Sequence, residues 1–551
     1  MTSQTLQTPS ASEIRVGSVS HGEVYTQRWV VDMILDLVGY TPDRYLAGLS
    51  ITDPACGSGA FLVAIVERLS QSCRKFDCEL PTTGIQAFDI LERNVETSRR
   101  NIEATLVDEG WERITAQNLA AQWVKPGDYL LQDQHVPTDL VVGNPPYIRI
   151  EDVPASRMDL YRLRNKTMTG RSDVYVGFYE QGLKALKPGG KLGFICADRW
   201  MRNQYGRELR KLISEKFAVD SLVVMHDVDA FEDKVAAYPA ITVIRNGPQR
   251  SAAVVDTSKE LKQRHSEELV SWLKCSESTN MEHAAFRAAR LPHWFEGTDS
   301  WPMGSPERLA LLEDLSDRYP TLEESGVKVG IGVATGADSV FLTKLDNLVE
   351  EDRMLPLSMV KDAKKGSYEW TGHYLVNPWT REGDLVDLRA YPRLNSHFEK
   401  NRVTLESRYV AKKNPQRWYR TIDKVDFALT ERPKLLFPDM KLNIHPTLEL
   451  GGYYPHHNLY YMVSDCWDLE VLGGILLSRL AQMFIEAYAV RMRGGTLRFQ
   501  AQYLRRIRVP RPETLDSAVE KALVDAFRLR DVGGATQAAL RAYGISRLPA
   551  R

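Results

Sequence analysis

Two hydrophobic patterns alternate along residues 26–246 of this chain. Short runs of consecutive apolar residues, each as long as a buried strand, alternate with longer stretches whose apolar residues recur every three or four positions. The short runs are 49–52, 85–88, 139–142, 191–196 and 221–225, and the helical stretches are 59–69, 91–106, 174–186 and 205–217. This order predicts an α/β fold with a doubly wound parallel sheet. The next run, 238–245, follows a loop without a long helix, so we expect it to pair antiparallel.

Two segments precede this alternation. Residues 1–20 are rich in Ser, Thr and Gln and contain few large apolar side chains, which predicts a flexible arm. Residues 26–38 carry apolar side chains at helical spacing, which predicts a helix with one buried face. We therefore expect a first domain over residues 21–250.

The second half of the chain lacks a regular alternation. Beyond Asn246 the sequence becomes polar, so we expect residues 251–310 to be a connecting segment. From 311 to 513, short strand and turn signals mix with helices such as 469–488, which predicts a separate α+β domain. Residues 514–551 predict a helical tail.

The composition is that of an ordinary globular protein. The chain has 551 residues, 43% of them hydrophobic and 26% charged, so it can form more than one core. Its 71 Lys and Arg against 72 Asp and Glu give a net charge of −1, so a nucleic-acid partner must be met by local patches. No run approaches the roughly 18 apolar residues of a membrane span, and the start lacks a signal peptide's apolar core. We expect a cytoplasmic protein without a membrane partner.

The sequence gives little indication of a metal site. The six cysteines are scattered and lack the paired spacing of zinc sites. His445, His456 and His457 are the only histidine cluster, and nearby Gly451, Gly452 and Pro455 favour interpreting it as a polar loop. We therefore expect no metal.

A glycine-rich loop lies between a predicted strand and a predicted helix at residues 53–60. Gly57 and Gly59 let the backbone approach a ligand closely, and the start of the helix presents free N–H groups. One strand later comes Asp89, whose carboxylate can accept hydrogen bonds from both ribose hydroxyls. Thirty positions separate Gly59 from Asp89, more than the roughly 20 of dinucleotide enzymes, and the loop lacks their GxGxxG. The loop indicates a nucleoside-containing cofactor other than a nicotinamide, although an ordinary tight turn is the alternative.

A further acidic residue follows a third segment. Asp128, in Gly127-Asp128-Tyr129, can accept a hydrogen bond from an adenine amino group while Tyr129 covers the ring. Taken without its neighbours, Asp128 is better explained as a surface turn residue.

The tetrapeptide Asn144-Pro145-Pro146-Tyr147 directly follows the apolar run 139–143, at the carboxyl end of a strand, where open α/β sheets bind ligands. An exocyclic amine is a poor nucleophile because its lone pair is delocalised into the ring. The Asn144 side-chain oxygen and the Pro145 carbonyl can each accept one amine hydrogen and localise that lone pair. Tyr147 offers a face on which an extruded base can stack. These features indicate methylation of a planar amine.

Together these motifs carry a family resemblance. Tyr25-Thr26, then DPACGSG, AFDI, GDY and NPPY in that order, resemble the gamma class of amino-methyltransferases, the DNA adenine-N6 enzymes of restriction-modification systems. The resemblance spans residues 21–246. It implies a Rossmann-like S-adenosylmethionine-dependent methyltransferase domain, S-adenosyl-L-methionine as cofactor, double-stranded DNA as substrate, and a separate restriction endonuclease as functional partner. We expect the protein to act as a monomer.

The resemblance also implies a role for individual residues. The cofactor-binding residues would be Tyr25, Thr26, Asp53, Ala55, Gly57, Gly59, Asp89, Ile90, Asp128 and Tyr129, and the residues at the reacting base would be Asn144, Pro145, Tyr147 and Phe231. Phe231, in a later loop, would complete a sandwich around the target base, and a buried core phenylalanine is the alternative. The family's usual proline after Tyr-Thr is Gln27 here, which puts the detail of that segment in doubt.

DNA contacts are expected mainly in the second domain, where residues 311–511 loosely resemble target-recognition domains. Val329–Asp338 and Arg417–Arg420 carry that similarity. Residues 491–511 contain seven arginines and no acid, which predicts a phosphate track, with a solvated basic face as the alternative. The arginines that we assign to DNA are Arg491, Arg493, Arg498, Arg505, Arg506 and Arg508.

Other functions are compatible with parts of this pattern. Methyltransferases for RNA bases or protein glutamines share NPPY but usually carry small accessory domains, whereas roughly 300 residues follow the first domain here. A catalytically silent DNA-binding protein would not need Asn144 or the glycine loop. Only about twenty residues precede the first motif, and the carboxyl end shows no nuclease-like cluster, so we expect modification without cleavage.

Overall fold

The computed structural model describes residues 24–132, 135–232, 238–274, 278–292, 295, 297–363, 366–489 and 496–549. The chain divides into two compact units, residues 1–310 and 311–551, and the boundary falls inside helix α10 (Pro306–Arg318). Each unit has its own core of buried apolar side chains. The predicted arm, residues 1–20, lies outside the described residues.

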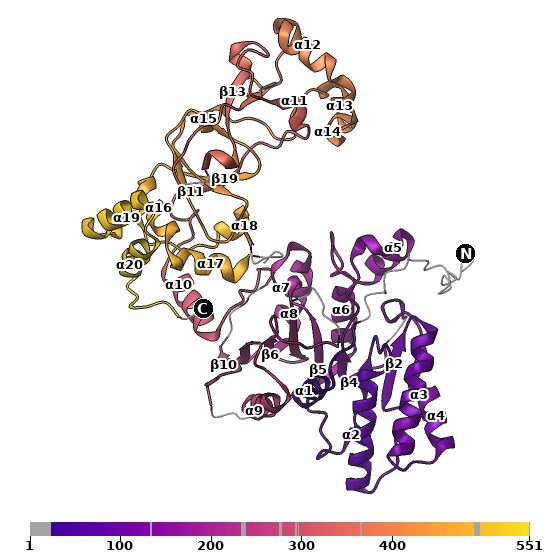
Figure 1. The fold of residues 1–551 in the computed structure, drawn as a ribbon. Coiled ribbons are helices and arrows are strands. Elements are labelled where there is room, and N and C mark those ends of the chain that lie inside the picture. Colours follow the sequence, from indigo (N-terminus) through magenta and orange to yellow (C-terminus); the bar gives the residue numbers. More distant parts are fainter. Residues whose placement is uncertain are drawn as a thin grey trace. The chain divides into compact units, whose positions relative to one another are not determined.

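The first unit is built on a mixed sheet of ten strands in the order β3-β2-β1-β4-β5-β7-β6-β8-β10-β9. Strands β2, β4, β5, β6 and β10 of this sheet are labelled in Figure 1. Its first seven strands in chain order are β1 (Ile51–Asp53), β2 (Ile85–Asp89), β3 (Val124–Pro126), β4 (Thr138–Gly143), β5 (Leu186–Ala197), β6 (Ala218–Val224) and β7 (Pro239–Arg245). Strands β1 to β5 are parallel, and β7 lies antiparallel between β5 and β6. The α/β fold class and the antiparallel strand predicted from the pattern are confirmed.

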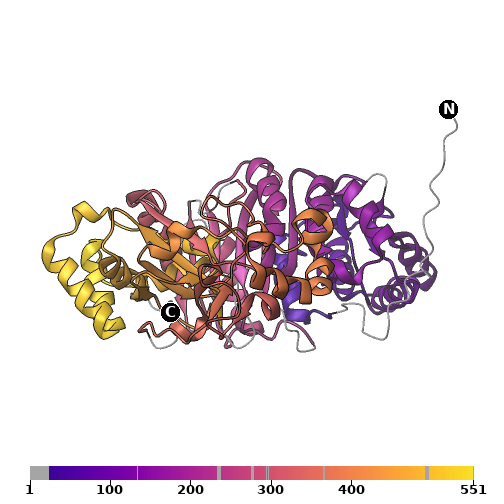
Figure 2. The ribbon, with the colours of Figure 1, turned by 90° about the horizontal axis from the view of Figure 1, so that it is seen from above.

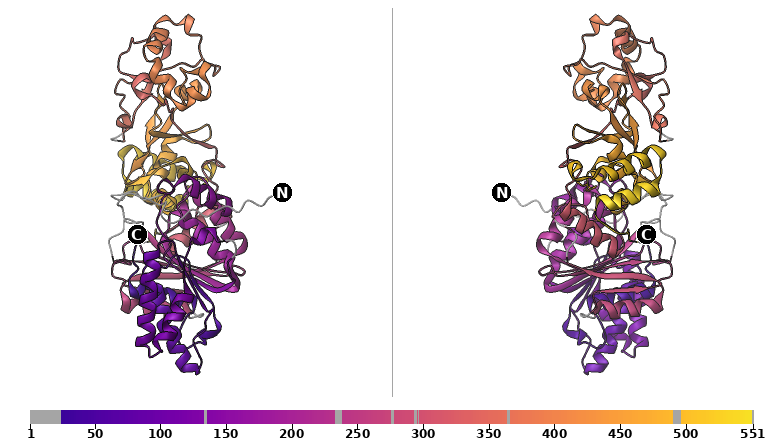
Figure 3. Two further views of the ribbon diagram at one scale, coloured as in Figure 1. Left: turned by 90° about the vertical axis from the view of Figure 1, so that its right-hand side faces the viewer. Right: turned by 90° about the vertical axis from the view of Figure 1, so that its left-hand side faces the viewer.

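Helices lie on both faces of this sheet (Figure 3). They are α1 (Arg28–Val38), α2 (Ala60–Phe76), α3 (Glu92–Asp108), α4 (Arg113–Trp123), α5 (Ala155–Arg164), α6 (Tyr175–Ala185), α7 (Arg199–Arg202), α8 (Arg207–Lys216) and α9 (Gln263–Lys274). Helix α1 shows why the spacing was informative: Val30, Ile34 and Val38 are all buried, whereas Arg28 on the same helix is exposed and pairs with Asp32. The pattern did not predict α4 or α5, which have weaker amphipathic spacing.

Residues 251–310 are not the connecting segment that their polarity suggested. They add β8 (Ala252–Thr257), β9 (Asn280–His283) and β10 (Phe286–Leu291) to the sheet, with β8 parallel to β6 and β10 antiparallel to β8. The residues 252–255 of β8 are fully buried between neighbouring strands. A four-residue apolar run was enough to form a strand because the existing sheet edge supplied its hydrogen-bonding partner.

The second unit contains two four-stranded sheets, in the orders β11-β19-β15-β17 and β12-β14-β13-β18, and a two-stranded β16-β20 pair. The strands are β11 (Val327–Ile331), β12 (Leu342–Thr343), β13 (Met354–Ser358), β14 (Tyr374–Val376), β15 (Lys434–Pro438), β16 (Met440–Lys441), β17 (Thr447–Glu449), β18 (Tyr454–Pro455), β19 (Leu459–Ser464) and β20 (Leu497–Arg498). The helices after α10 are α11 (Asp338–Phe341), α12 (Pro392–Lys400), α13 (Arg402–Ser407), α14 (Tyr409–Lys413), α15 (Phe427–Glu431), α16 (Leu469–Leu477), α17 (Arg479–Tyr488), α18 (Ala501–Leu504), α19 (Ser517–Leu529) and α20 (Val532–Ala542).

The predicted helix 469–488 is two helices. Helix α16 ends at Leu477 and α17 begins at Arg479, and the two are bent by 65° relative to each other. Ser478 ends one and caps the other, because its hydroxyl accepts a hydrogen bond from the Ala481 N–H. Among the described residues, no single helix is long and apolar enough to cross a membrane, and the side chains of this bent pair are mostly buried within the unit.

The carboxyl-terminal helices α19 and α20 lie side by side (Figure 2). They pack on α16, where Leu477, Ala526 and Ala535 form a small core. Residues 514–551 are thus an integral part of the second unit.

Candidate active site

A cavity of about 470 Å³ opens at the carboxyl ends of β1, β2 and β4. These three strands are neighbours, so the loops that follow Asp53, Asp89 and Gly143 converge there. The residues expected in the site that line the cavity are Tyr25, Thr26, Ala55, Gly57, Asp89, Ile90, Asp128, Tyr129, Asn144 and Tyr147. Motifs spread over more than a hundred positions therefore meet in one place.

The glycine loop forms one wall of this cavity. Gly59 has φ +95° and precedes α2, and a Cβ there would lie 3.1 Å from the Ser98 hydroxyl, so the turn requires glycine. Asp53 is not among the described lining residues. It is buried under the loop, where its carboxylate accepts a hydrogen bond from the Ala55 N–H at 3.2 Å. Burial raises the pKa of Asp53 to about 7.

Asp89 holds the glycine loop in place. Its carboxylate accepts hydrogen bonds from the backbone N–H of Gly57 at 3.0 Å and of Leu91 at 2.8 Å, and from the Asn94 amide at 3.2 Å. The carboxylate therefore links the loop after β1 to the start of α3 while it lines the cavity. This places an acceptor one strand away from the glycines, as the sequence predicted.

Asp128 forms the centre of a buried polar group that includes helix α5. One carboxylate oxygen accepts from the Leu130 N–H at 3.1 Å, and the other accepts from the Tyr161 hydroxyl at 2.7 Å. Arg157 lies 3.9 Å from the same oxygen, and within the described part of the chain its buried Nη1 has no hydrogen-bond partner. Burial raises the pKa of Asp128, and the contacts with Tyr161 and Arg157 partly offset that effect.

Arg157, Tyr161 and Phe178 line the cavity but were missed by the sequence reasoning. They lie in α5 and α6, well after the recognisable motifs, and each is a common residue type without a diagnostic neighbour. One signal was available for Phe178, since the helical stretch 174–186 was predicted and its apolar face had to pack against the sheet.

The Asn144 side chain is anchored on one side and free on the other. Its Nδ2 donates to the Val24 carbonyl at 2.9 Å and to the Thr26 hydroxyl at 3.2 Å. Its Oδ1 is buried and has no hydrogen-bond partner among the described residues. The amide is therefore held in one orientation, with an unused acceptor at the cavity.

The segment that contains Thr26 also pairs with the loop that carries Phe231. Thr26 and Phe231 form an antiparallel bridge, and the N–H of Glu232 donates to the Tyr25 carbonyl at 2.9 Å. Gln27 adds two further bonds, from its N–H to the Ala230 carbonyl at 3.0 Å and from its Nε2 to the Phe231 carbonyl at 3.2 Å. A proline at this position has no N–H to donate. Gln27 thus contributes a backbone contact that the proline expected from the resemblance cannot make.

Two aromatic residues meet beside this loop. The rings of Tyr147 and Phe231 lie 6.4 Å apart, with an interplanar angle of 83°. Phe231 is 8% exposed and, like Gly59 and Pro145, is not among the described residues that line the cavity. The Tyr147 hydroxyl is buried, no described residue hydrogen-bonds to it, and burial raises its pKa. The two rings are nearly perpendicular to each other, and the role of Phe231 toward a ligand remains a prediction.

The arginines assigned to DNA occupy varied environments in the second unit. Arg491 and Arg493 lie outside the described residues. Arg498 pairs with Asp439 at 2.5 Å, Arg505 with Glu323 at 2.7 Å and Arg508 with Glu324 at 3.5 Å. Arg506 lies over the ring of Tyr488. The acids are distant in sequence, so the net positive charge of residues 491–511 is partly balanced in the folded unit.

The aromatic side chains of residues 417–420, which the sequence suggested as part of a DNA-recognition surface, contribute to the packing of the second unit. Trp418 is 7% exposed and belongs to the core, and the Tyr419 hydroxyl donates to the Val386 carbonyl. These aromatic side chains are used to build the unit.

The sheet order, with β7 antiparallel between β5 and β6, is typical of the fold of S-adenosylmethionine-dependent methyltransferases, and the motifs lie at its carboxyl edge. A family model described as Eco57I restriction-modification methylase matches residues 63–231. The type II methyltransferase M.XhoI of Xanthomonas vasicola is 41% identical over 533 residues, which cover 95% of this chain and 97% of that protein. M.PaeR7I of Pseudomonas aeruginosa is also 41% identical, over 96% of this chain and 93% of its own length. The chain therefore belongs to the type II methyltransferases of restriction-modification systems.

A solved structure extends the likeness in fold to the whole chain. The type IIL restriction-modification enzyme MmeI in complex with DNA has a TM-score of 0.55 and 12% identity, and the match covers 95% of this chain and 74% of that one. At this identity the likeness concerns the fold.

Proposed function

We propose that this protein transfers a methyl group from S-adenosyl-L-methionine to the exocyclic N6 amine of an adenine in a specific double-stranded DNA sequence. The observation that carries the proposal is the buried, unpartnered Oδ1 of Asn144, since both other sides of that amide are fixed by Val24 and Thr26. An acceptor held in this way has a use only when a donor such as an amine enters the cavity.

The cavity suits the proposed cofactor. Its volume of about 470 Å³ lies within the range of small-molecule sites. Unpartnered buried polar atoms of Tyr129, Asn144, Tyr147 and Arg157 belong to its lining, which indicates a ligand with several polar groups. By the family pattern, Asp89 with Ile90 would hold the ribose, Asp128 with Tyr129 the adenine ring, and Tyr25 with Thr26 the methionine end. When bound, S-adenosylmethionine supplies an electrophilic methyl group.

The reaction asks the chain to prepare a weak nucleophile. Asn144 Oδ1 and the Pro145 carbonyl would each accept one hydrogen of the target amine, which concentrates its lone pair on nitrogen and directs it toward the methyl donor. The methylated amine is then positively charged and a strong acid, so it loses a proton readily and needs no strong general base. The rigid prolines keep both acceptors in register.

Reaching the amine requires the base to leave the helix. Tyr147 would stack on the extruded base, and Phe231, held by the bridge to Thr26, would support it from the neighbouring loop. The packing of Phe231 against Tyr147 supports one shared aromatic wall at this point.

Target recognition would belong to the second unit. The α+β architecture of residues 311–513 and the arginines from Arg498 to Arg508 support a DNA-binding role, with phosphate contacts that form as the arginines exchange their present carboxylate partners. We further propose that the protein acts as a monomer and protects DNA from a separate restriction endonuclease.

The test uses three parallel reactions, each with the protein and S-adenosylmethionine that carries a labelled methyl group. The acceptor is double-stranded DNA in the first reaction, RNA in the second and a protein mixture in the third. We expect label in DNA only. After the DNA is digested to nucleosides, chromatography should find the label in N6-methyl-2′-deoxyadenosine. Label in a pyrimidine, in RNA or in protein glutamine would contradict the proposal.

A further inference from the structure

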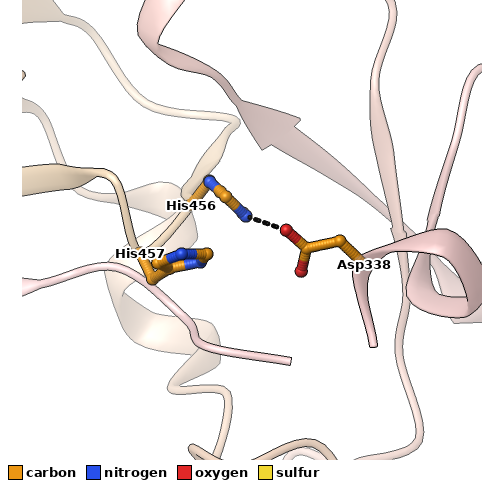
Figure 4. A group of neighbouring side chains, drawn as sticks. All are labelled: Asp338, His456 and His457. Carbon is orange, nitrogen blue, oxygen red and sulfur yellow. Dashed lines mark hydrogen bonds and ion pairs between the residues drawn. The ribbon is translucent and has the colours of Figure 1, made fainter. Parts of the chain in front are cut away.

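Three side chains from two separate segments of the second unit meet at one point (Figure 4). Asp338 is the first residue of α11, and His456 and His457 follow β18. The Asp338 Oδ2 lies 3.2 Å from the His456 Nε2, and the two imidazole rings are 4.0 Å apart. One ligand atom from each of the three residues lies within 4.8 Å of the others.

The backbone holds both histidines firmly against the loop that leads to Asp338. Val333 and His456 form a parallel bridge, and the His457 N–H donates to the Val333 carbonyl at 3.1 Å. Gly332 makes this approach possible, because a Cβ there would lie 2.2 Å from the Pro455 carbonyl oxygen. The Thr335 hydroxyl donates to Asp338 Oδ1, which leaves Oδ2 directed at His456.

The sequence suggested a polar loop here, and His457 does lie in a turn, but His456 is part of a β-bridge and is buried. His456 is only 1% exposed. Its Nδ1 and the Nδ1 of His457 are both buried without a hydrogen-bond partner among the described residues. Because His456 Nε2 faces Asp338, this nitrogen, and not the unpartnered Nδ1, can share a ligand with the carboxylate.

We propose that Asp338, His456 and His457 bind a zinc ion. Two imidazole nitrogens and one carboxylate oxygen are ligands that zinc prefers, and a water molecule would complete its tetrahedron. Tetrahedral coordination at about 2.0–2.1 Å places ligand atoms roughly 3.3 Å apart. The Asp338 and His456 atoms already have this spacing, and the His457 ligand atom, which lies within 4.8 Å of both, has to move closer to form the third bond.

The zinc ion would have a structural role, because it would cross-link two segments of the second unit. It would join the loop of residues 332–338, within the Val329–Asp338 stretch singled out above, to the turn at residues 455–457. All three ligands lie in the second unit, whereas the candidate active site lies in the first. Zinc binding can therefore be measured independently of methyl transfer. Failure of the zinc proposal would not contradict the proposed methyltransferase activity, and failure of that activity would not contradict zinc binding.

The experiment uses the full-length protein, dialysed against a chelator and then freed of it. Titration with zinc chloride is followed by calorimetry, and titration with Co²⁺ is followed by its visible absorption, which reports tetrahedral nitrogen and oxygen ligands. We expect one equivalent of zinc per chain. Because replacement of the buried His456 threatens folding, the test variants are Asp338→Asn and His457→Ala, which change more exposed side chains.

Each test variant is expected to weaken zinc affinity by more than about tenfold. His445→Ala, which removes a histidine elsewhere in the same unit, is the matched control and should leave affinity unchanged. Zinc should also raise the melting temperature of the wild type but not that of an Asp338→Asn, His457→Ala double variant. Equal zinc binding by the wild type and that double variant, or no stoichiometric binding by the wild type, would overturn the proposal.

Discussion

The amide of Asn144 donates a hydrogen bond to the hydroxyl of Thr26, 118 positions earlier in the chain, at 3.2 Å. A second bond from the same nitrogen reaches the Val24 carbonyl at 2.9 Å. With both hydrogens engaged, the amide cannot turn its oxygen away from the cavity. The segment around Thr26 therefore sets the direction of the acceptor on which the proposed chemistry depends.

Asn144→Ala is expected to lower the methylation rate by at least about a hundredfold with little change in DNA affinity, because the lost acceptor acts mainly in the transition state. Thr26→Val keeps the acceptor but removes one of its anchors, so a smaller loss is expected. Single-turnover rates and binding measured on the same DNA separate the two effects. Equal rates for Asn144→Ala and the wild type would exclude the mechanism.

Asp89→Asn is expected to weaken S-adenosylmethionine binding by about 1 to 3 kcal/mol, because ribose hydroxyls lose a charged acceptor. Asparagine has the shape of aspartate but only one acceptor oxygen, so it can still accept from the Leu91 N–H but not also from the Gly57 N–H, and part of the loss comes from this contact with the glycine loop. Calorimetry on the variant gives the difference. Asp108→Asn, an exposed change at the end of α3, serves as the control, and matching affinities for both variants would remove Asp89 from the site.

Base extrusion predicts a fluorescence signal. A fluorescent adenine analogue at the target position should brighten when the protein binds, because the base leaves its stack, and a mismatch opposite the target should tighten binding. Phe231→Ala and Tyr147→Ala should reduce the brightening. Tyr45→Ala changes an exposed aromatic residue of the same unit and should not affect it. No brightening with the wild type on its proven target would count against extrusion.

Salt titration tests the second unit's arginines. If Arg505, Arg506 and Arg508 contact phosphates, replacing all three by alanine should lower the slope of log K against log salt by up to about three and weaken all DNA sequences alike. Arg528→Ala is the matched control, since Arg528 is also an exposed, carboxylate-paired arginine of this unit. A triple variant with an unchanged slope would show that these arginines do not contact phosphates and that Arg505 and Arg508 serve only their pairs with Glu323 and Glu324.

The buried carboxyl of Asp53 predicts a pH-dependent stability. Burial raises its pKa from 3.8 to about 7, so the folded state holds a proton that the unfolded state releases between these values. The protonated carboxyl therefore makes its full contribution to the free energy of unfolding below pH 3.8, and this contribution is lost as the pH rises through about 7. As the pH rises over this range, the free energy of unfolding of Asp53→Asn should increase relative to that of the wild type by up to about 4 kcal/mol. Denaturant unfolding at several pH values checks this, and a constant difference would contradict it.

Much of the first unit was readable from the sequence, because strand and helix periods there alternate and each motif ends a strand. The loops after Asp53, Asp89 and Gly143 had to converge once their strands were adjacent and parallel. Long-range packing was not readable in the same way. Arg157 and Tyr161 reach Asp128 from a helix with weak amphipathic spacing, and the bonds from Gln27 to residues 230 and 231 depend on a pairing 200 positions apart.

In the second unit, local composition was a poor guide. The sequence suggests that the seven arginines of residues 491–511 form one basic surface. In the folded unit, however, Glu323 and Glu324, which lie far earlier in the sequence, pair with Arg505 and Arg508. Similarly, two adjacent histidines looked like loop residues because nothing in the sequence shows that Val333 and Gly332 pack over them.

The strands β8 and β10 have a practical consequence for anyone who wishes to produce the first unit separately. A fragment cut after Asn246, where the sequence becomes polar, would strip β8 from β6 and leave a buried strand whose N–H and C=O groups are unpaired along residues 221–224 of that edge. Such an edge invites association between copies and precipitation. A soluble fragment should instead extend to the end of β10 at Leu291 or beyond.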